Sequence, residues 1–366
     1  MLPIEWQNVR RILVIRLDNI GDVVMLSPAL RTIHSHLPNA SITLMASPAG
    51  SQVAPLLPGV DRVIVQRVVW QDASWVMPLD PAREESLIAK IKAENFDAAL
   101  IFTSFSQSPY PPAYICYLAG IGLRIGQSKE FGGSVLSQWV KPLSDDFHQV
   151  DRNLFLLESA GFKAEGRHLE LTVTEEMQNN GDRLLLSTGI APNQPFIMLA
   201  PGASCAARRY DIDRFAAVAS MLAAETKLKV VVVGSDRETE LVAPVLNNSN
   251  IVSLVGKTSV PELAAIVKRS SLVIANNSGT MHIADALLKP MVVLYSGTEL
   301  ESQWQPRNAP TKLLRRFTEC SPCYGFQCPY QMECLDISPD EVVREAVKLL
   351  EESLLVENLS SEMVRY

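Results

Sequence analysis

Short runs of β-branched residues, interspersed with segments of helical spacing, recur along this 366-residue chain and constrain its fold more than any other feature. Ile12–Leu17 and Lys229–Gly234 are the plainest runs, and Val23–Leu37 and Asp213–Thr226 show helical spacing, with a kink expected at Pro28. A strand that is apolar at nearly every position is typical of a parallel sheet covered on both faces. The alternation therefore predicts an α/β fold.

The alternation continues through both halves of the chain without a sequence repeat between them. At about 100–200 residues per domain, this length corresponds to about two domains, each able to bury its own core. The polar stretch Thr172–Asn193 is the expected boundary, and a long amphipathic helix is expected over Ser338–Leu354. Two Rossmann-like domains of this kind would place a central cleft between the carboxyl ends of their sheets.

Composition excludes several classes of protein. The chain has 33 Lys and Arg against 40 Asp and Glu, a formal net charge of −7, which argues against a nucleic-acid partner. It has no run of about 18 uncharged apolar residues and no long apolar segment near its N-terminus. We therefore expect a cytoplasmic protein.

The strongest local signal for a ligand lies in LVIANNSGTMH, residues 272–282. A strand ends here in a polar turn that opens a helix, so the backbone N–H groups of Gly279, Thr280 and Met281 would point out of the helix start. The helix dipole adds partial positive charge at that place, which favours a phosphate. An ordinary capped loop is the alternative.

The first turn, Asp18–Asp22, carries two carboxylates and only one glycine. A dinucleotide-binding turn needs G-x-G-x-x-G, so a nicotinamide-dependent dehydrogenase is disfavoured. Carboxylates repel a phosphate, but they can take a proton from a hydroxyl group. Asp22 is thus a candidate base, although its position also suits a helix N-cap.

The turn at residues 201–211, PGASCAARRYD, places Arg208 and Arg209 just before a helix. The arginine fork suits phosphate oxygens, and two solvated surface arginines are the alternative. Asp211-Ile212-Asp213 has the D-x-D pattern of a metal-dependent nucleotide-sugar site. Acidic residues are expected at a helix start for electrostatic reasons alone, so we assign no metal there.

Four cysteines lie within 15 positions, spaced C-x2-C-x4-C-x5-C: Cys320, Cys323, Cys328 and Cys334. This spacing suits a structural zinc or iron site, in which four thiolates leave no open position for a substrate. Such a site would be remote from the reacting groups. The spacing matches neither common iron–sulfur pattern, and free thiols or disulfides are the alternatives.

Several of these segments together resemble glycosyltransferase family 9, the ADP-heptose:lipopolysaccharide heptosyltransferase family. The resemblance spans nearly the whole chain and is carried by ILVIRLDNIGDVVMLSPAL, APGAS, NNSGTMHIADALLKPMVVLYSGT and CSPCYGFQCPYQMECLDISPDEV. It implies a GT-B fold, with two Rossmann-like domains facing a central cleft. Residues 1–172 would form the acceptor domain, and residues 173–366 the nucleotide-sugar donor domain with the cysteine-rich loop 320–334 and the C-terminal helix.

The resemblance also implies an inverting transfer of a heptose-like sugar from an ADP-sugar to a lipopolysaccharide-type or other glycan acceptor, without a catalytic metal. Asp22, in the I-G-D turn, would remove the proton of the acceptor hydroxyl. Glu238 and Thr258 would contact the nucleoside. Asn277 stands where the family usually has aspartate, and Arg208 where it usually has lysine. The implied phosphate-binding residues are Ser204, Arg208, Asn277, Ser278, Gly279, Thr280, Met281 and His282.

Such an enzyme would also need residues that bind the acceptor, and it could contact the membrane. Arg124 and Lys129 would hold an anionic acceptor, or be solvated surface charges. Trp70 and Trp75 lie in an aromatic stretch that suits peripheral contact with the inner face of the cytoplasmic membrane, or packing under a loop. The alternatives in function are another nucleotide-sugar enzyme of this fold, such as an epimerase, and a non-catalytic family member.

Overall fold

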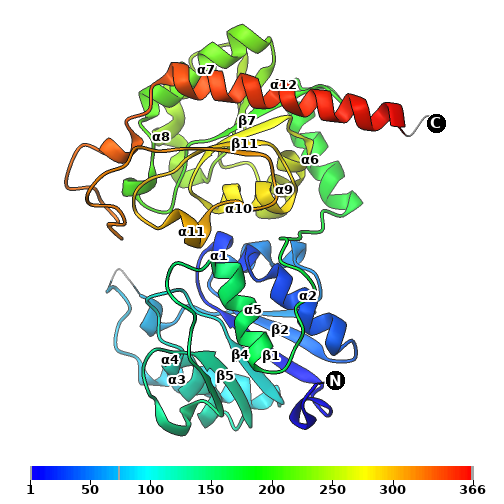
Figure 1. The fold of residues 1–366 in the computed structure, drawn as a ribbon, viewed down its shortest axis with the longest axis vertical. Coiled ribbons are helices and arrows are strands. Elements are labelled where there is room, and N and C mark those ends of the chain that lie inside the picture. Colours follow the sequence, from blue (N-terminus) through cyan, green and yellow to red (C-terminus); the bar gives the residue numbers. More distant parts are fainter. Residues whose placement is uncertain (1, 73–74, 364–366) are drawn as a thin grey trace. The chain divides into compact units, whose positions relative to one another are not determined.

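The computed structural model describes residues 2–72 and 75–363. The chain divides into two compact units, unit 1 at residues 1–172 and unit 2 at residues 173–366 (Figure 1). Each unit holds one six-stranded sheet, and all paired strands are parallel. Parallel neighbours need crossover connections, which is why helices alternate with strands along the chain. The predicted α/β architecture is confirmed.

The sheet of unit 1 has the order β3-β2-β1-β4-β5-β6, so the chain begins at the middle and extends toward both edges. Its strands are β1 Arg11–Arg16, β2 Ser41–Ala46, β3 Arg62–Val65, β4 Ala98–Ile101, β5 Leu123–Gln127 and β6 Gln138–Val140. Its helices are α1 Ile20–Val24, α2 Ser27–His36, α3 Pro81–Ala93, α4 Tyr110–Leu118 and α5 Gln149–Ser159.

The helix predicted over Val23–Leu37 is in fact two helices, α1 and α2. Pro28 lies in the first turn of α2, not at a kink inside a longer helix. Proline has no backbone N–H to donate, and only the first turn of a helix tolerates that without losing a hydrogen bond. The break keeps α1 short.

The sheet of unit 2 has the order β12-β11-β10-β7-β8-β9. Its strands are β7 Phe196–Ala200, β8 Lys229–Val232, β9 Ile251–Ser253, β10 Leu272–Asn276, β11 Met291–Leu294 and β12 Thr311–Leu314. Its helices are α6 Glu175–Ser187, α7 Ile212–Thr226, α8 Thr239–Val242, α9 Val260–Arg269, α10 Gly279–Ala286, α11 Glu301–Trp304 and α12 Pro339–Met363.

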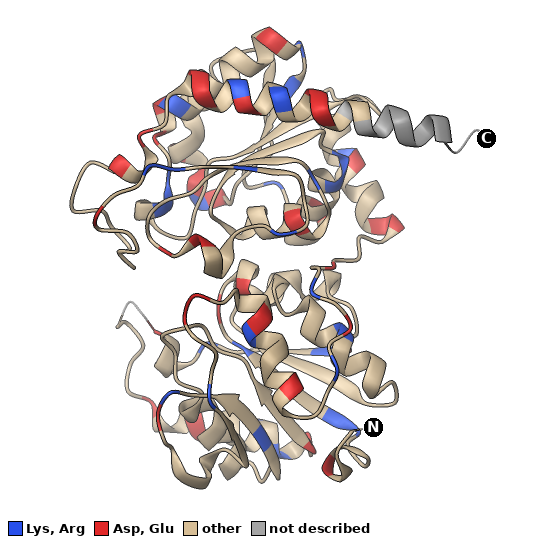
Figure 2. Cartoon of the chain, viewed as in Figure 1, with Lys and Arg blue, Asp and Glu red and all other residues tan. Residues whose placement is uncertain are grey.

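The C-terminal helix predicted from Ser338 is α12. Its apolar side, including Val342, Ala346 and Leu349, is buried in the same core as α7 and the central strands of unit 2. Acidic and basic residues alternate along its other positions (Figure 2). In the part of the chain that the structure describes, no helix is both long enough and apolar enough to cross a bilayer.

Candidate functional site

The polar site of unit 1 is built around Arg16, the last residue of β1. β1 lies between β2 and β4, so the strand order reverses at this point. A reversal of this kind leaves a crevice at the carboxyl ends of the strands. The Arg16 side chain is completely buried, and a buried guanidinium needs an opposite charge beside it.

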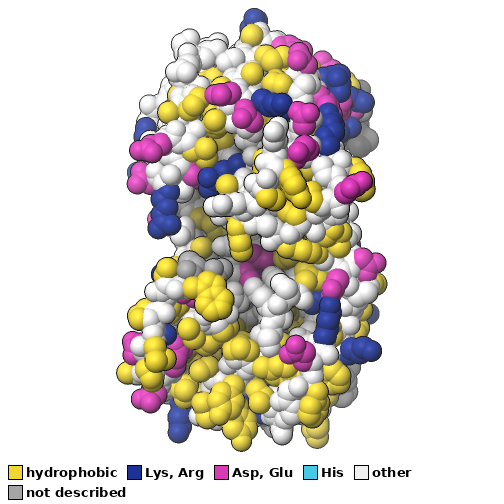
Figure 3. Space-filling model, turned by 90° about the vertical axis from the view of Figure 1, so that its left-hand side faces the viewer, with side chains coloured by type: hydrophobic (Ala, Val, Ile, Leu, Met, Phe, Trp, Pro, Cys, Tyr) yellow, Lys and Arg dark blue, Asp and Glu magenta, His cyan; other side chains and the backbone are white. Residues whose placement is uncertain are grey.

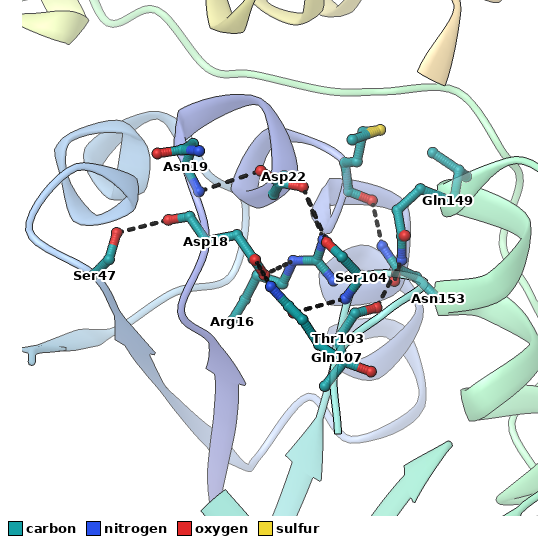
Figure 4. Close-up of polar contacts among 12 residues, drawn as sticks. Arg16, Asp18, Asn19, Asp22, Ser47, Thr103, Ser104, Gln107, Gln149 and Asn153 are labelled. Carbon is teal, nitrogen blue, oxygen red and sulfur yellow. Dashed lines mark hydrogen bonds and ion pairs between the residues drawn. The ribbon is translucent and has the colours of Figure 1, made fainter. Parts of the chain in front are cut away.

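Two carboxylates from the first turn compensate this charge (Figure 4). Arg16 Nε lies 3.0 Å from Asp18 Oδ2, and Arg16 Nη2 lies 2.9 Å from Asp22 Oδ1. Arg16 Nη2 also donates to Ser104 Oγ, at 2.9 Å, in the loop after β4. The three charged groups therefore form one network.

Asp22 is not the N-cap of α1, as its position had suggested. Asn19 is the N-cap, and its backbone N–H donates to Asp22 Oδ2 at 3.2 Å as half of a capping box. The Asp22 side chain is 16% exposed, against 8% for Asp18. Asp22 is therefore the carboxylate that a substrate hydroxyl can reach more readily.

Asp18 has a distinct environment, which was not predicted from the sequence. Burial raises the pKa of Asp18 to about 6, with Asp22 also raising it, while Arg16 and a hydrogen bond from Gln107 lower it. Gln107 is itself held, because its Oε1 accepts the Ser104 N–H at 2.9 Å. The charge of Arg16 at the end of an apolar strand was the available signal for this cluster.

The two basic residues predicted for the acceptor differ in their surroundings. Arg124 is buried, and its guanidinium donates to four backbone carbonyl oxygens, those of Ile121, Gly122, Ser134 and Val135. This arrangement holds the turn before β6 and gives Arg124 a structural role. Lys129 is half-exposed, with its Nζ 2.5 Å from Asp145 Oδ2.

The two tryptophans predicted for a membrane contact also differ. Trp70 packs, partly buried, against the core of unit 1, which was the alternative role for it. Trp75 is 93% exposed, and Val76 and Leu79 nearby are exposed as well. Figure 3 shows hydrophobic side chains on the face of unit 1 that is turned toward the viewer. Membrane contact through Trp75 stays a prediction.

The polar site of unit 2 lies where its own strand order reverses, at β7 between β10 and β8. Asn276, the buried last residue of β10, ties the neighbouring turns together. Its Oδ1 accepts the Tyr210 N–H at 3.0 Å, and its Nδ2 donates to the Pro201 carbonyl at 2.7 Å. Asn276 was not predicted from the sequence, whereas the adjacent Asn277 was.

The start of α10 carries two buried polar atoms that have no hydrogen-bond partner among the described residues, Asn277 Nδ2 and Ser278 Oγ. Buried polar atoms are nearly always paired, so two unpaired ones beside a helix start favour a bound ligand. Gly279 and Thr280 carry the first helical N–H groups, which lack partners within the helix. The Met281 N–H instead donates to the Ser278 carbonyl at 3.1 Å.

A relay of hydrogen bonds joins Arg208 to this helix start. Arg208 Nε donates to Thr298 Oγ1 at 3.2 Å, Thr298 Oγ1 lies 3.0 Å from Ser296 Oγ, and Ser296 Oγ donates to Asn277 Oδ1 at 3.2 Å. The structure thus brings together two residues predicted to bind phosphate. Ser296 and Thr298, which link them, were missed because they lie on a separate turn after β11.

The two adjacent arginines have different partners. Arg208 is ion-paired with Glu299, and its Nη1 donates to Ser204 Oγ at 3.4 Å. Arg209 Nη2 donates to the Ala203 carbonyl at 3.1 Å and so holds its own turn. Arg208 is therefore the arginine linked to the helix start, where an anion would compete with Glu299 for it.

Glu238 lies against the turn after β7. Its Oε2 accepts from the Ser235 N–H at 2.7 Å, and its Oε1 lies so close to Gly202 that a Cβ there would displace the Glu238 carboxylate. Two further predicted residues lie nearby in sequence to the helices α9 and α10. Thr258 is partly buried before α9, and His282 is buried within α10.

The D-x-D pattern lies at a helix start, as predicted from the sequence. Asp211 is the N-cap of α7, and its Oδ1 accepts the Arg214 N–H at 2.9 Å. Asp213 lies in the first turn of the same helix, where a negative charge is favourable.

The cysteine-rich loop 320–334 is not remote from the predicted phosphate residues. The Tyr324 N–H donates to the Thr298 carbonyl at 2.9 Å, and the Ala207 N–H donates to the Phe326 carbonyl at 3.1 Å. Thr298 accepts from Arg208, and Ala207 precedes it in the chain. The loop therefore packs against both segments that position Arg208.

The cysteines of this loop are close enough to influence one another. Burial raises the pKa of Cys334, and Cys328, Cys320 and Cys323 raise it further, against a backbone hydrogen bond from Gly297. All four are free thiols in the structure. Over residues 2–72 and 75–363, no three His, Cys, Asp or Glu side chains are arranged to hold a metal ion.

Comparison with known proteins gives consistent results. The family model of glycosyltransferase family 9 (heptosyltransferase) matches residues 85–333. Lipooligosaccharide heptosyltransferase 2 of Campylobacter jejuni is 27% identical over 347 residues, which cover 92% of this chain and 97% of that protein.

Two solved structures share the fold. ADP-heptose lipopolysaccharide heptosyltransferase II of Escherichia coli matches with a TM-score of 0.74 at 22% identity, covering 93% of this chain and 99% of that one. The iron-containing dodecameric glycosyltransferase TibC of enterotoxigenic E. coli matches with a TM-score of 0.52 at 14% identity, covering 94% and 77%. At these identities the likeness establishes the GT-B architecture.

The environment of Asp18 predicts a pH dependence of stability that Asp18→Asn should remove. The folded-state pKa of about 6 lies above the ordinary value of 3.8, so the folded chain binds this proton more tightly than the unfolded chain. The contribution of Asp18 to the stability of the wild type, taken as the difference from Asp18→Asn, should therefore fall as pH rises between about 4 and 6, by up to about 3 kcal/mol. Urea unfolding across this range measures the fall, and an equal fall in the variant would contradict the assignment.

Proposed function

We propose the following activity for this chain, which belongs to glycosyltransferase family 9, the heptosyltransferase family. It transfers a heptose from ADP-heptose to a lipopolysaccharide-type glycan acceptor, with inversion at the anomeric carbon. Relatives with heptosyltransferase names span more than nine-tenths of the chain and support this choice of sugar. The observation that carries the proposal is the relay that joins Arg208 to the unpaired polar atoms at the start of α10.

The donor diphosphate would bind in unit 2. The N–H groups of Gly279 and Thr280, Asn277 Nδ2 and Ser278 Oγ are donors for its oxygens, and Arg208 supplies a positive charge. These groups stabilise the negative charge that grows on ADP as the glycosidic bond breaks, in place of a divalent cation. Glu238, beside the turn after β7, is proposed for the nucleoside together with Thr258.

The acceptor hydroxyl would bind in unit 1, at Asp22. Its oxygen attacks the anomeric carbon, Asp22 takes its proton, and ADP leaves with the electron pair of the broken bond. One displacement of this kind inverts the configuration of the sugar. Arg16 and the Asn19 N–H each hold one carboxylate oxygen of Asp22, which positions this base.

Asp22→Asn should lower turnover at least about a hundredfold, the usual contribution of a positioned base, while ADP binding stays unchanged. Steady-state transfer assays and calorimetry with ADP measure the two effects. Asp80→Asn is the matched control, since Asp80 caps the start of α3 and Asp22 also belongs to a capping motif. Normal turnover by folded Asp22→Asn would leave Asp22 with the capping role alone.

Arg208→Ala should weaken ADP binding by about 1.5–3 kcal/mol, the range for a charged hydrogen bond. Arg209→Ala is the control and should have a smaller effect, because its guanidinium bonds the Ala203 carbonyl. Calorimetry with ADP compares the two variants. Equal losses in both, or no loss in Arg208→Ala, would remove Arg208 from the donor site.

We further propose that loop 320–334 is a structural element whose four thiols bind zinc or iron. The donor chemistry fits either metal, and the solved structure of TibC is described as iron-containing. The thiols influence one another electrostatically but do not surround one point, so binding would draw them together. No step of the transfer depends on this metal.

Elemental analysis of protein purified without a metal-binding tag should find about one zinc or iron per chain if all four thiolates bind. Cys323→Ser should lose the metal. Cys116→Ser, which changes a buried cysteine of unit 1, should keep it. Metal-free protein with four titratable thiols would contradict this proposal and leave the transferase assignment unaffected.

A further inference from the structure

Two amide side chains of α5 are buried beside the polar site of unit 1, and the proposed function does not use them. Gln149 is completely buried, and Asn153 is 2% exposed. They lie four positions apart, so they share one face of the helix. A buried amide is costly to a fold unless its hydrogen bonds are made, and an apolar residue would fill the same position without that requirement. The bonds of these amides therefore indicate what they do.

Gln149 and Asn153, here named the amide pair, bond to each other and to the backbone of two distant segments (Figure 4). Gln149 Nε2 donates to Asn153 Oδ1 at 2.8 Å and to the Thr103 carbonyl at 3.2 Å. Asn153 Nδ2 donates to the Met25 carbonyl at 3.0 Å. The two carbonyls lie 46 and 128 positions away in the chain. The amide pair therefore joins three parts of unit 1 that only the fold brings together.

The segment bonded by Asn153 is helix α1, which carries Asp22. α1 has only five residues, and a helix of that length is not stable by itself. Its N-terminal end is held by the capping box of Asn19 and Asp22. Met25 is the cap residue at its other end, where the carbonyls lack partners within the helix. The bond from Asn153 therefore holds the end of α1 that the capping box leaves unsupported.

The segment bonded by Gln149 is the loop after β4, which contacts the Arg16 network. Thr103 precedes Ser104, whose Oγ accepts from Arg16 Nη2 at 2.9 Å and lies 3.5 Å from Asp22 Oδ1. Arg16 Nη2 lies 2.9 Å from the same carboxylate oxygen. The amide pair thus bonds both the helix that carries Asp22 and the loop that faces its carboxylate. These bonds restrain the separation of the two segments.

Gln149 has one further property, which stability alone does not explain. Its Oε1 is buried and has no hydrogen-bond partner among the described residues. An unpaired buried acceptor costs folding free energy, so such atoms are rare in native proteins. The cost is accepted more readily at functional sites than elsewhere. The Gln149 amide is therefore better explained by the segments that its Nε2 joins than by a contribution to stability.

We propose that Gln149 and Asn153 are positioning residues for Asp22, which hold α1 and the Ser104 loop at the separation that proton transfer requires. The inference rests on the proposed function, in which Asp22 is the base. Loss of the amide pair leaves the Asp22 carboxylate in place chemically but lets α1 shift relative to the loop. A shift of about 1 Å can cost about a hundredfold in rate. The effect should fall on turnover, because the proposed donor site lies in unit 2.

Hydrogen exchange of the full chain tests the restraint without an assay of activity. In Asn153→Ala, the amides of α1 should exchange at least about tenfold faster than in the wild type, because a buried hydrogen bond is lost. Gln138→Ala is the matched control, since Gln138 Nε2 donates to the Ser159 carbonyl at 2.7 Å and so bonds the other end of α5 through the same chemistry. It should leave exchange in α1 unchanged. Unchanged exchange in Asn153→Ala, or an increase spread over all of unit 1, would overturn the proposal.

The transfer assay tests the consequence for the reaction. Asn153→Ala should lower kcat at least about tenfold and leave the KM of the ADP-sugar and the Kd of ADP unchanged. Gln149→Met, which keeps the length of the side chain but not the amide, should do the same. Gln138→Ala should keep the kcat of the wild type. An equal loss in Gln138→Ala would show that any disturbance of α5 lowers turnover, and that result contradicts a specific role of the amide pair.

A double-mutant cycle separates positioning of Asp22 from a general role in the fold. In the Asp22→Asn background, Asn153→Ala should lower the remaining turnover by less than about twofold, because the base through which Asn153 acts is gone. Equal proportional losses in both backgrounds would refute positioning. Wild-type protein that neither binds ADP nor transfers a sugar would refute the proposed function instead, and hydrogen exchange would still decide whether the amide pair holds α1.

Discussion

A guanidinium buried at the carboxyl end of a central strand determines the arrangement of the first site. The residues of β1 between Arg11 and Arg16 are all apolar and buried. A charge at Arg16 is therefore tolerated only with carboxylates close by. The sequence supplies both in the next turn, at Asp18 and Asp22. Because Asn19 caps the start of α1 between them, Asp18 stays at the buried strand end and Asp22 lies in the more exposed helix turn.

The polar site of unit 2 is proposed to bind an anion, the donor diphosphate, and it is lined mainly by neutral polar groups. A diphosphate is repelled by carboxylates, and the buried side chains around the start of α10 are amides and hydroxyls: Asn276, Asn277, Ser296 and Thr298. Asparagine at 277 has a physical rationale, since Oδ1 accepts from Ser296 while Nδ2 remains as a donor. An aspartate could fill the first role but not the second. Glu299 is the exception, and it is held by Arg208.

The strands and turns that could be predicted from the sequence are those that a local pattern of residues specifies. Uninterrupted apolar runs identified the central strands, and the turns at Asp22 and Gly279 were visible because each follows such a run. Partners from distant segments were not predictable: Ser104 bonds Arg16 across 88 positions, and Gln107 bonds Asp18 across 89. Only the pairing of β1 with β4 brings them together. The surroundings of Arg124 were not predictable for a related reason, because its carbonyl partners depend on the conformation of another turn.

The cysteine-rich loop contacts the segments that hold Arg208 in the proposed donor site. Its backbone bonds the segments of Ala207 and Thr298, and Arg208 lies between these two contacts as neighbour of one and donor to the other. The Arg208 guanidinium can hold its place in the relay only if both segments keep their positions. A loop rich in proline and glycine has few apolar contacts with which to maintain them, so cross-linking by its thiols is a physical means of doing so. Asp22 belongs to the other unit, and none of the contacts named here involves it. Under the proposed function, the loop would therefore act on how the leaving group is held and not on the base.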